Sequence, residues 1–492
     1  MRHPTRRSKI VCTLGPASNS LENLLKIIEA GMDVARINFS HGDHKQHKEN
    51  IALVREASKR LNIPVGILAD LQGPKIRVGK LKAPIQLDKG KKLYFRGIDA
   101  QAARVLADGS EAFPVEVSYP RLVEDLIPNS LMLLDDGLIR LKVIEKIPSK
   151  NLLLAEVEAG NVLFDNKGVN FQGARLSASG ITEKDWEDIQ FGLEHDVDFF
   201  ALSFVRTARE IRYLKSYLAD KKSGIMVIAK IEKAEALQEL EDIIKASDGI
   251  MVARGDLGVE IGNENVPVWQ KKIINMSHQY ARPVITATQM LTSMVENPTP
   301  TRAEASDISN AVFDGTDALM LSNESSVGKY PIEAVSTMAN IVEAAETYMR
   351  QTANPNDLIE GTLEDAVPIS AAIESAAVVL ATNLKAKCLA CLTRSGQSAR
   401  LLAKHRPSMP IFAFVENQKV QKQLCLSWGI FVVPWREMQQ QDYTIFDELM
   451  EELKRIGQVK KSDIAILTAG IPTSRLVGTA NTVVVRQFRS LM

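Results

Sequence analysis

The first seventy residues alternate short apolar runs with segments of helical periodicity. Apolar runs that suit buried strands occupy residues 9–15, 33–40 and 64–70. Between them, the segments 20–31 and 43–61 place apolar residues at helical spacing. Strands that alternate with helices in this way predict a parallel sheet.

The period changes to two between about residue 73 and residue 172. Asp136-Gly137 is a strong turn signal, and apolar and cationic residues alternate beyond it from Ile139 to Val143. The pattern predicts a β-rich insertion, entered through Gly73-Pro74 and left through the stretch 170–174.

Helical and strand patterns alternate again after the insertion. A helix is predicted at 182–196, where Thr182 and Asp185 form a capping-box pattern. Five apolar runs follow at 198–204, 225–231, 249–253, 283–289 and 317–322. Three strands before the insertion and five after it predict a (β/α)8 barrel, whose active site lies at the carboxyl ends of its strands.

From about residue 350 a separate α/β pattern begins, which predicts an open sheet. We therefore expect an α/β protein of three domains: a (β/α)8 barrel at 1–72 and 173–349, an inserted β-rich lid at 73–172, and a C-terminal α/β regulatory domain at 350–492.

Composition narrows the class of protein. The 492 residues carry 60 Lys and Arg and 60 Asp and Glu, so the formal net charge of zero provides no field that attracts nucleic acid or a membrane. No run of about 18 apolar residues occurs, and the basic start lacks the apolar segment of a secretory signal. Four cysteines are too few for a disulfide framework, and Cys388-x-x-Cys391 is better explained by a buried strand than by a redox or metal site. We expect a cytoplasmic protein without nucleic-acid or membrane partners.

Polar residues follow the predicted barrel strands. Any one of them could be a helix cap or a surface charge, but their recurrence on one rim favours a functional site. They are Arg36, Asn38, Ser40, His41, Asp70, Ser203, Arg206, Lys230, Glu232, Asp256, Thr288, Ser322 and Glu324.

Lys230 and Glu232 are two residues apart in an extended segment, so their side chains point the same way. They could form a simple ion pair. At the rim they also suit a site in which a carboxylate holds Mg²⁺ and an ammonium meets developing charge. Gly255 and Asp256 follow the next strand, where backbone N–H groups and a second carboxylate suit an anion and a hard metal, although a plain glycine turn fits the segment alone.

Six motifs together resemble the pyruvate kinase family. They are KIVCTLGPAS, RINFSHG, AKIEK, MVARGDLGVEI, ITATQML and PTRAE, in order along the chain. The resemblance implies Mg²⁺-dependent (or Mn²⁺-dependent) phosphoryl transfer from phosphoenolpyruvate to ADP, giving ATP and pyruvate, usually in a homotetramer.

The resemblance also implies roles for residues at matching positions. Glu232 and Asp256 would hold the metal, and Lys230 and Arg36 would stabilise the transferring phosphoryl group and the enolate. The remaining residues are assigned to the substrate carboxylate (Gly255, Asp256, Thr288), to enolate protonation (Thr288, Ser306), and to the nucleotide (Asn38, His41, Arg77, Asp136, Lys167).

Lys75 departs from the family pattern. Relatives commonly bind K⁺ through positions matching Asn38, Ser40, Asp70 and the carbonyl of Leu71, and usually have glutamate where this chain has Lys75. We expect the Lys75 ammonium to replace the monovalent cation, so that catalysis does not require K⁺. An exposed lysine after a proline turn is the alternative interpretation, but the neighbouring set of cation ligands favours the replacement of K⁺.

Two further segments bear on regulation and the rim. In the last domain, Thr393, Arg394, Ser395, Gly396 and Ser398 suit either a helix cap or an effector phosphate, and the resemblance favours the phosphate. The stretch 469–482 lacks the glycine-rich loop of relatives that bind fructose 1,6-bisphosphate, so AMP or a sugar monophosphate is the better expectation. Asn323 stands where relatives usually have glycine, and the stretch 168–173 also differs from their pattern, which bears on the strand-8 turn and on the lid hinge.

Two other functions are alternatives to phosphoryl transfer. Another Mg²⁺-dependent barrel enzyme acting on pyruvate or phosphoenolpyruvate, such as an aldolase or lyase, would not depend on ADP. A non-catalytic metabolite-binding protein would not need Lys230, Glu232, Asp256 and Thr288 together.

Overall fold

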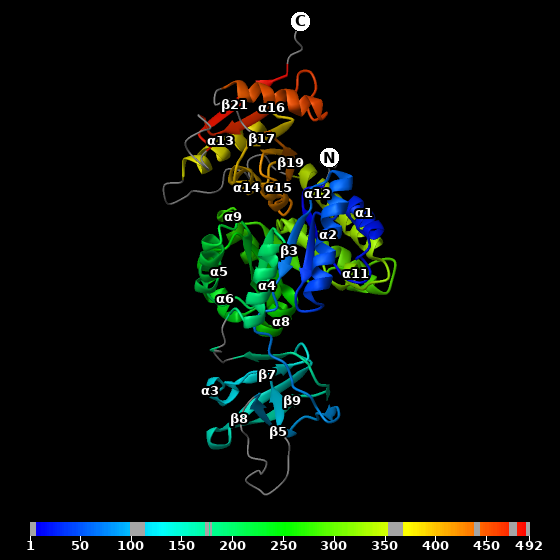
Figure 1. Ribbon diagram of the computed structural model, residues 1–492, viewed down its shortest axis with the longest axis vertical. Coiled ribbons are helices and arrows are strands. Elements are labelled where there is room, and N and C mark those ends of the chain that lie inside the picture. Colours follow the sequence, from blue (N-terminus) through cyan, green and yellow to red (C-terminus); the bar gives the residue numbers. More distant parts are fainter. Residues whose placement is uncertain are drawn as a thin grey trace.

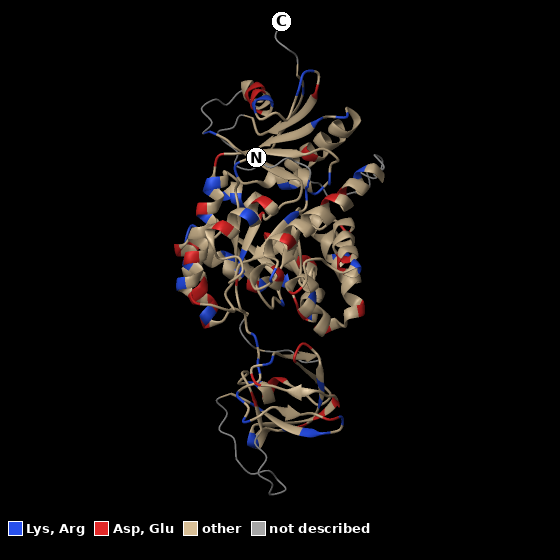
Figure 2. Cartoon of the chain, turned by 90° about the vertical axis from the view of Figure 1, so that its right-hand side faces the viewer, with Lys and Arg blue, Asp and Glu red and all other residues tan. Residues whose placement is uncertain are grey.

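The structure is a computed structural model that describes residues 6–98, 114–172, 177, 180–352, 368–436, 443–471 and 480–488. The barrel lies in the middle of the molecule, with the β-rich lid at one end and the C-terminal domain at the other (Figure 1). Lysine and arginine are interspersed with aspartate and glutamate on the barrel helices (Figure 2). No helix in the described ranges combines the length and apolar character that crossing a membrane requires.

Eight parallel strands close the barrel in the order β1-β16-β15-β14-β13-β12-β3-β2. The strands are β1 (Lys9–Thr13), β2 (Val34–Asn38), β3 (Gly66–Asp70), β12 (Phe199–Leu202), β13 (Met226–Ile231), β14 (Gly249–Ala253), β15 (Val284–Ala287) and β16 (Ala318–Leu321). All eight were predicted from the sequence, and the barrel class is confirmed.

Helices surround the barrel strands. They are α1 (Leu21–Ala30), α2 (His44–Leu61), α4 (Glu183–Glu194), α5 (Ala208–Asp220), α6 (Ala234–Gln238), α7 (Leu240–Ala246), α8 (Arg254–Ile261), α9 (Val266–Gln279), α10 (Arg302–Phe313), α11 (Asn323–Ser326) and α12 (Pro331–Thr352), with 3-10 turns Asn263–Asn265 and Thr292–Val295. The capping box expected at Thr182 and Asp185 begins α4. Ser322 and Asn323 pass directly from the end of β16 into α11.

The lid is a six-stranded sheet in the order β11-β7-β8-β9-β5-β6, with a two-stranded sheet β10-β4 beside it. Its elements are β4 (Ile85–Gln86), β5 (Lys92–Gly97), β6 (Val115–Val117), α3 (Leu122–Asp125), β7 (Leu131–Leu134), β8 (Ile139–Ile147), the 3-10 turn Pro148–Lys150, β9 (Leu152–Ala159), β10 (Val162–Leu163) and β11 (Val169–Gln172). The predicted Asp136-Gly137 turn joins β7 to β8, and both residues have positive φ.

The lid is tied to the barrel through β11. The Gln172 amide donates to the carbonyls of Val259 and Glu260 at 2.7 Å each, and the Asn170 amide donates to the Glu260 carboxylate at 3.2 Å. The rest of the expected exit hinge, residues 173–174, lies outside the described residues. The expected limits of the three domains stay a prediction.

The C-terminal domain is an open five-stranded sheet in the order β19-β18-β17-β20-β21, antiparallel only at β21. Its elements are α13 (Ile369–Asn383), β17 (Cys388–Leu392), α14 (Gln397–Ala403), β18 (Ile411–Val415), α15 (Gln418–Leu424), β19 (Ile430–Pro434), α16 (Thr444–Arg455), β20 (Ile464–Ala469) and β21 (Thr482–Gln487). Cys388 and Cys391 pack into different apolar clusters, and burial raises the pKa of Cys388 to about 12, so a reactive thiol pair is excluded here.

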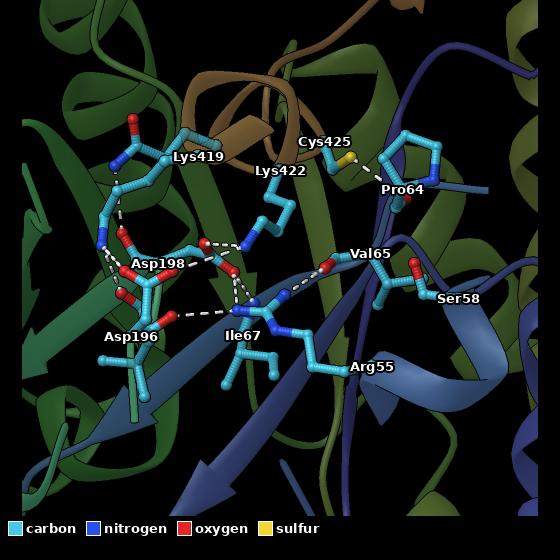
Figure 3. A network of polar contacts seen from close by, with 12 residues as sticks. Arg55, Ser58, Pro64, Val65, Ile67, Asp196, Asp198, Lys419, Lys422 and Cys425 are labelled. Atoms are coloured by element: carbon cyan, nitrogen blue, oxygen red, sulfur yellow. Dashed lines mark hydrogen bonds and ion pairs between the residues drawn. The ribbon is translucent and has the colours of Figure 1, made fainter. Parts of the chain in front are cut away.

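The C-terminal domain docks on the amino-terminal ends of the barrel strands. Cys425 and Leu426 join the apolar cluster that fills this end of the barrel. Beside them Lys419 pairs with Asp196, and the Lys422 ammonium lies 3.7 Å from the Asp198 carboxylate, which also binds Arg55 at 3.0 Å (Figure 3). On this side of the interface, cations of one domain therefore meet carboxylates of the other.

Glu374, which is fully buried in α13, makes the stability of this domain depend on pH. Burial raises its pKa to about 8 from 4.5, and the hydrogen bond from Thr468 offsets this only in part. The unfolded chain loses this proton at lower pH than the folded chain. The contribution of Glu374 to the free energy of unfolding is therefore largest below about pH 4.5 and is lost as the pH rises through 8.

Between pH 5.5 and 7.5 we expect the free energy of unfolding of the wild type to fall by up to about 1.4 kcal/mol per pH unit, and we expect Glu374→Gln to remove this fall. Urea unfolding at several pH values measures this difference. Glu451→Gln, at an exposed position of α16, is the control. Parallel pH curves for the wild type and Glu374→Gln would contradict it.

Candidate active site

A network of buried charges occupies the carboxyl ends of β2, β3 and β13. The Lys230 ammonium lies 3.2 Å from the Asp70 carboxylate and 3.0 Å from the Glu232 carboxylate. It also donates to the Ser203 hydroxyl at 2.6 Å. Arg36 donates from Nε to the other Asp70 oxygen at 2.7 Å. The structure thus brings together residues that the sequence placed on four different strands.

Asp70 is the centre of this network. It ends β3 and is 1% exposed. Burial alone would raise the pKa of Asp70, but the charges of Lys230 and Arg36 outweigh that effect and hold the pKa below its ordinary value. Burial alone would lower the pKa of Lys230, but the charges of Asp70 and Glu232 outweigh that effect and raise it. Lys230 therefore stays charged, and it lies beside Arg36 on the same carboxylate, where a bound anion would meet both side chains.

Thr13 also belongs to the network, although sequence analysis did not select it. Its hydroxyl accepts from Arg36 Nη1 at 2.9 Å and donates to the Leu321 carbonyl. Thr13 thus fixes the direction of the Arg36 guanidinium. Its position at the end of β1 was the available signal, because the other strands all contribute polar residues there.

Glu232 and Asp256 form a pair of neighbouring carboxylates. Glu232 is 2% exposed; burial, together with the Asp256 charge, raises its pKa against the opposing effect of Lys230. Glu232 also accepts from the backbone N–H of Phe204 at 2.6 Å, which holds Phe204 at a φ of 54° that is rare for a bulky residue. Two close carboxylates at a partly dry rim suit a divalent cation.

No cluster of three or more His, Cys, Asp or Glu suited to a metal occurs in the part of the chain that the structure describes. The two carboxylates alone still fit Mg²⁺, because that ion is usually held by one or two carboxylates together with substrate oxygens and water.

The start of α8 faces the end of β15. The Gly255 N–H donates to the Thr288 hydroxyl at 2.9 Å, and Thr288 has a φ of 69°. A Cβ at Gly255 would make only an ordinary contact, with the Thr288 hydroxyl at 3.6 Å, so glycine keeps the backbone accessible beside that hydroxyl. Ser306 lies exposed on α10, and among the described residues it makes no hydrogen bond with Thr288.

Arg254, which sequence analysis missed, supports this turn. Its guanidinium donates to the carbonyls of Ala287, Thr288 and Gln289 at 2.7–3.3 Å and pairs with Asp307 at 2.8 Å. These bonds compensate for the left-handed backbone at Thr288 and Gln289. Arg254 directly precedes Gly255, but the sequence contains no sign of a partner more than thirty residues away.

A cleft that measures about 560 Å³, with its open mouth included, separates the lid from this rim. Its charged lining residues are Lys75, Asp136, Arg206, Lys233 and Asp256. The other residues predicted for a nucleotide lie differently. Arg77 donates to the Asn166 carbonyl at 3.0 Å and Lys167 pairs with Asp135 at 2.7 Å, both within the lid. His41 is exposed after β2.

The residues predicted for a monovalent cation are neighbours. Asn38 is paired with Asp70 in the β2–β3 register, and its side chain accepts from the Ser40 N–H at 3.1 Å. The Leu71 carbonyl accepts from the Ser203 hydroxyl at 2.7 Å. The cations on Asp70 here are Lys230 and Arg36. Lys75 instead lines the cleft, and its ammonium makes no hydrogen bond or ion pair with a described residue.

The predicted effector segment forms a tight turn before α14. Gly396 has a φ of 78°, and its N–H donates to the Thr393 hydroxyl at 3.0 Å. Arg394 and Ser395 are exposed, whereas Ser398 is buried. Most of the stretch 469–482, namely 472–479, lies outside the described residues.

Comparisons with known proteins agree with this geometry. Residues 5–335 match the pyruvate kinase barrel domain, and residues 371–486 match the pyruvate kinase alpha/beta domain. A pyruvate kinase from Geobacillus stearothermophilus is 42% identical over 490 residues, which are 99% of this chain and 81% of that relative. One from Staphylococcus epidermidis is 41% identical over 480 residues, covering 97% of this chain and 79% of the relative. The match to the crystal structure of a pyruvate kinase from Cryptosporidium parvum covers 98% of this chain and 96% of that chain. The two are 33% identical in sequence, with a TM-score of 0.89. The chain therefore belongs to the pyruvate kinase family of phosphotransferases.

Proposed function

We propose that the barrel rim transfers a phosphoryl group from phosphoenolpyruvate to ADP, giving pyruvate and ATP. The observation that carries this proposal is the position of Lys230 and Arg36, two permanent cations fixed on Asp70 beside the carboxylates Glu232 and Asp256. Phosphoryl transfer requires positioning and charge stabilisation more than covalent chemistry from the protein. Lys230 and Arg36 would stabilise the transferring group and the enolate that it leaves.

Glu232 and Asp256 would hold Mg²⁺ or Mn²⁺. When bound, the ion supplies positive charge that binds substrate oxygens and lowers the energy of the developing anion. The Gly255 and Asp256 backbone and the Thr288 hydroxyl would bind the substrate carboxylate. Thr288 and Ser306 would belong to the route that protonates the enolate.

The nucleotide would lie in the cleft between the lid and the barrel. Asp136 lines this cleft, and Arg77 and Lys167 are on the adjoining edge of the lid, so closure of the lid would bring them toward a bound nucleotide. Asn38 and His41 would face it from the barrel. Closure would also exclude water, which protects the phosphoryl group from hydrolysis.

The test is pyruvate production from phosphoenolpyruvate in an assay coupled to lactate dehydrogenase, with ADP and Mg²⁺ each added or omitted. We expect turnover only when both are present. Pyruvate formation without ADP would favour an aldolase or lyase, and binding without turnover would favour a metabolite-binding protein.

Three further properties belong to this proposal. Lys75 would replace K⁺, so added KCl would not be needed for catalysis. The Thr393–Ser398 segment would bind a phosphorylated effector, AMP or a sugar monophosphate rather than fructose 1,6-bisphosphate, which activation assays at low phosphoenolpyruvate would reveal. A homotetramer in the cytoplasm is the expected assembly and location.

Arg254 gives a prediction about positioning. We expect Arg254→Lys to lower kcat/KM for phosphoenolpyruvate about tenfold or more, because lysine keeps the charge but cannot bind three carbonyls and Asp307 at once. Steady-state kinetics measure the effect. Asp307→Asn, which removes only the ion pair, should cost less; an equal loss in both variants would contradict a role for the carbonyl bonds.

A further inference from the structure

A recess lies between the base of the barrel and the C-terminal domain. It opens at the amino-terminal ends of β15 and β16, whereas the catalytic rim is at their carboxyl ends. Including its mouth, it measures about 230 Å³. Its polar lining residues are His278, Arg282, Asp317, Arg400, Lys404, Arg406 and Ser427.

Three of the four lining cations have no carboxylate partner among the described residues. Arg282 donates only to the Lys245 carbonyl at 3.1 Å, and Arg400 only to the Ser395 carbonyl at 3.2 Å. Lys404 makes no side-chain bond with any residue in the described ranges. Burial lowers the pKa of Arg282 and Lys404, and it lowers that of Arg400 to about 10. At Arg282 and Arg400 the charge of Asp248 opposes this effect of burial only in part.

Asp317 cannot neutralise these three cations. Its carboxylate is already held by Arg406 at 3.0 Å and by the backbone N–H groups of Val284 and Trp428 at 3.0 and 3.1 Å. The nearby Asp248 is paired with Lys215 at 2.7 Å. The recess thus keeps a surplus of positive charge.

Unused donors also concentrate here. The described residues contain ten buried side-chain polar atoms without a hydrogen-bond partner, and four of them belong to residues that line this recess. They are Arg282 Nε, Arg400 Nη1, Arg406 Nε and Ser427 Oγ. Each can donate, and buried donors of this kind are normally satisfied.

The contrast with the other side of the same interface is informative. There Lys419 and Lys422 meet Asp196 and Asp198 (Figure 3). In the described part of the recess, the one carboxylate, Asp317, pairs with Arg406 and lies 3.7 Å from the His278 ring. The surplus charge is therefore local to the recess and is not a general property of the interface.

We propose that this recess binds the phosphate group of a small phosphorylated metabolite. Guanidinium forks match phosphate oxygens, and four donors of residues that line the recess have no hydrogen-bond partner among the described residues. Arg282 comes from the barrel and Arg400 and Lys404 from the C-terminal domain, so a ligand would join the two domains.

This site is separate from the Thr393–Ser398 segment, although Arg400 contacts the Ser395 carbonyl at its edge. Variants on the barrel side distinguish the two. Arg282 has no contact with that segment and no part in the catalytic rim.

The experiment is isothermal titration of the full chain with inorganic phosphate and, separately, with glycerol 3-phosphate. We expect Arg282→Gln and Lys404→Gln each to weaken binding at this site about tenfold or more, because each removes a charge-assisted contact. Arg212→Gln on exposed α5 removes the same charge and should change nothing. Tighter binding of the ester would identify a metabolite as the ligand; tighter binding of inorganic phosphate would identify the free ion.

Ser395→Ala separates this site from the effector segment. Retained phosphate affinity in Ser395→Ala, with loss in Arg282→Gln, supports the recess. Two results would overturn the proposal. One is phosphate affinity that is lost in Ser395→Ala but unchanged in Arg282→Gln. The other is phosphate binding that Arg282→Gln does not alter. Because binding is measured without turnover, failure here would leave the proposed phosphoryl transfer untouched.

Discussion

Lys230→Met is expected to lower kcat by about 10³-fold or more, with a much smaller change in KM for phosphoenolpyruvate. Lys230 is fixed by Asp70, Glu232 and Ser203, so its ammonium needs no reorganisation when charge develops on the substrate. Removing one such preorganised group commonly costs about 10²–10³ in rate, and a cation that acts on a phosphoryl group can be worth about 10³–10⁵. Steady-state kinetics with the coupled assay measure it.

The same substitution leaves two buried carboxylates without their ammonium, which can destabilise a protein by about 3–5 kcal/mol. Thermal unfolding must therefore accompany the kinetics. Asp70→Asn combined with Lys230→Met removes one of the stranded charges, so the double variant should recover stability but not turnover. Recovery of turnover in the double variant would show that Lys230 serves folding rather than catalysis.

The barrel was predictable because its sequence pattern is local. Each strand is a short apolar run, each helix has its own periodicity, and the Thr182–Asp185 capping box marks a helix start from four residues alone. The rim followed from the same reasoning, because the carboxyl ends of parallel strands meet at one face. Asp70, Lys230 and Glu232 accordingly lie within one network.

The features that the sequence did not predict depend on contacts between distant segments. Arg254 bonds to carbonyls that are 33 to 35 residues away, and carbonyls have no residue-type signature in a sequence. Arg282 and Arg400 meet only because two domains dock. Side-chain direction is the other missing quantity: the sequence placed Lys75 beside Asp70, whereas the structure puts it on the wall of the lid cleft with Asp136 and Asp256.

We expect Lys75→Glu to make turnover depend on K⁺, whereas turnover by the wild type is expected not to need K⁺. In the wild type we expect KCl to change the rate less than about twofold, since the cleft already holds this ammonium near Asp256. Glutamate reverses the charge at that wall, and a loss of about 1.4 kcal/mol or more of electrostatic stabilisation corresponds to a tenfold or larger fall in rate. Added K⁺ should restore most of it.

The ionic strength must be held constant with choline chloride, so that only the identity of the cation changes. Lys80→Glu, an exposed residue close to Lys75 in the chain, applies the same charge reversal and should leave the enzyme indifferent to K⁺. If the wild type itself needs K⁺, Lys75 is not the substitute cation. If Lys75→Glu is as active without K⁺ as the wild type, the charge at this position does not matter, and Lys230 and Arg36 alone, which already hold Asp70, are sufficient. Rescue confined to Lys75→Glu would instead mean that a tethered ammonium and a bound ion perform the same electrostatic task.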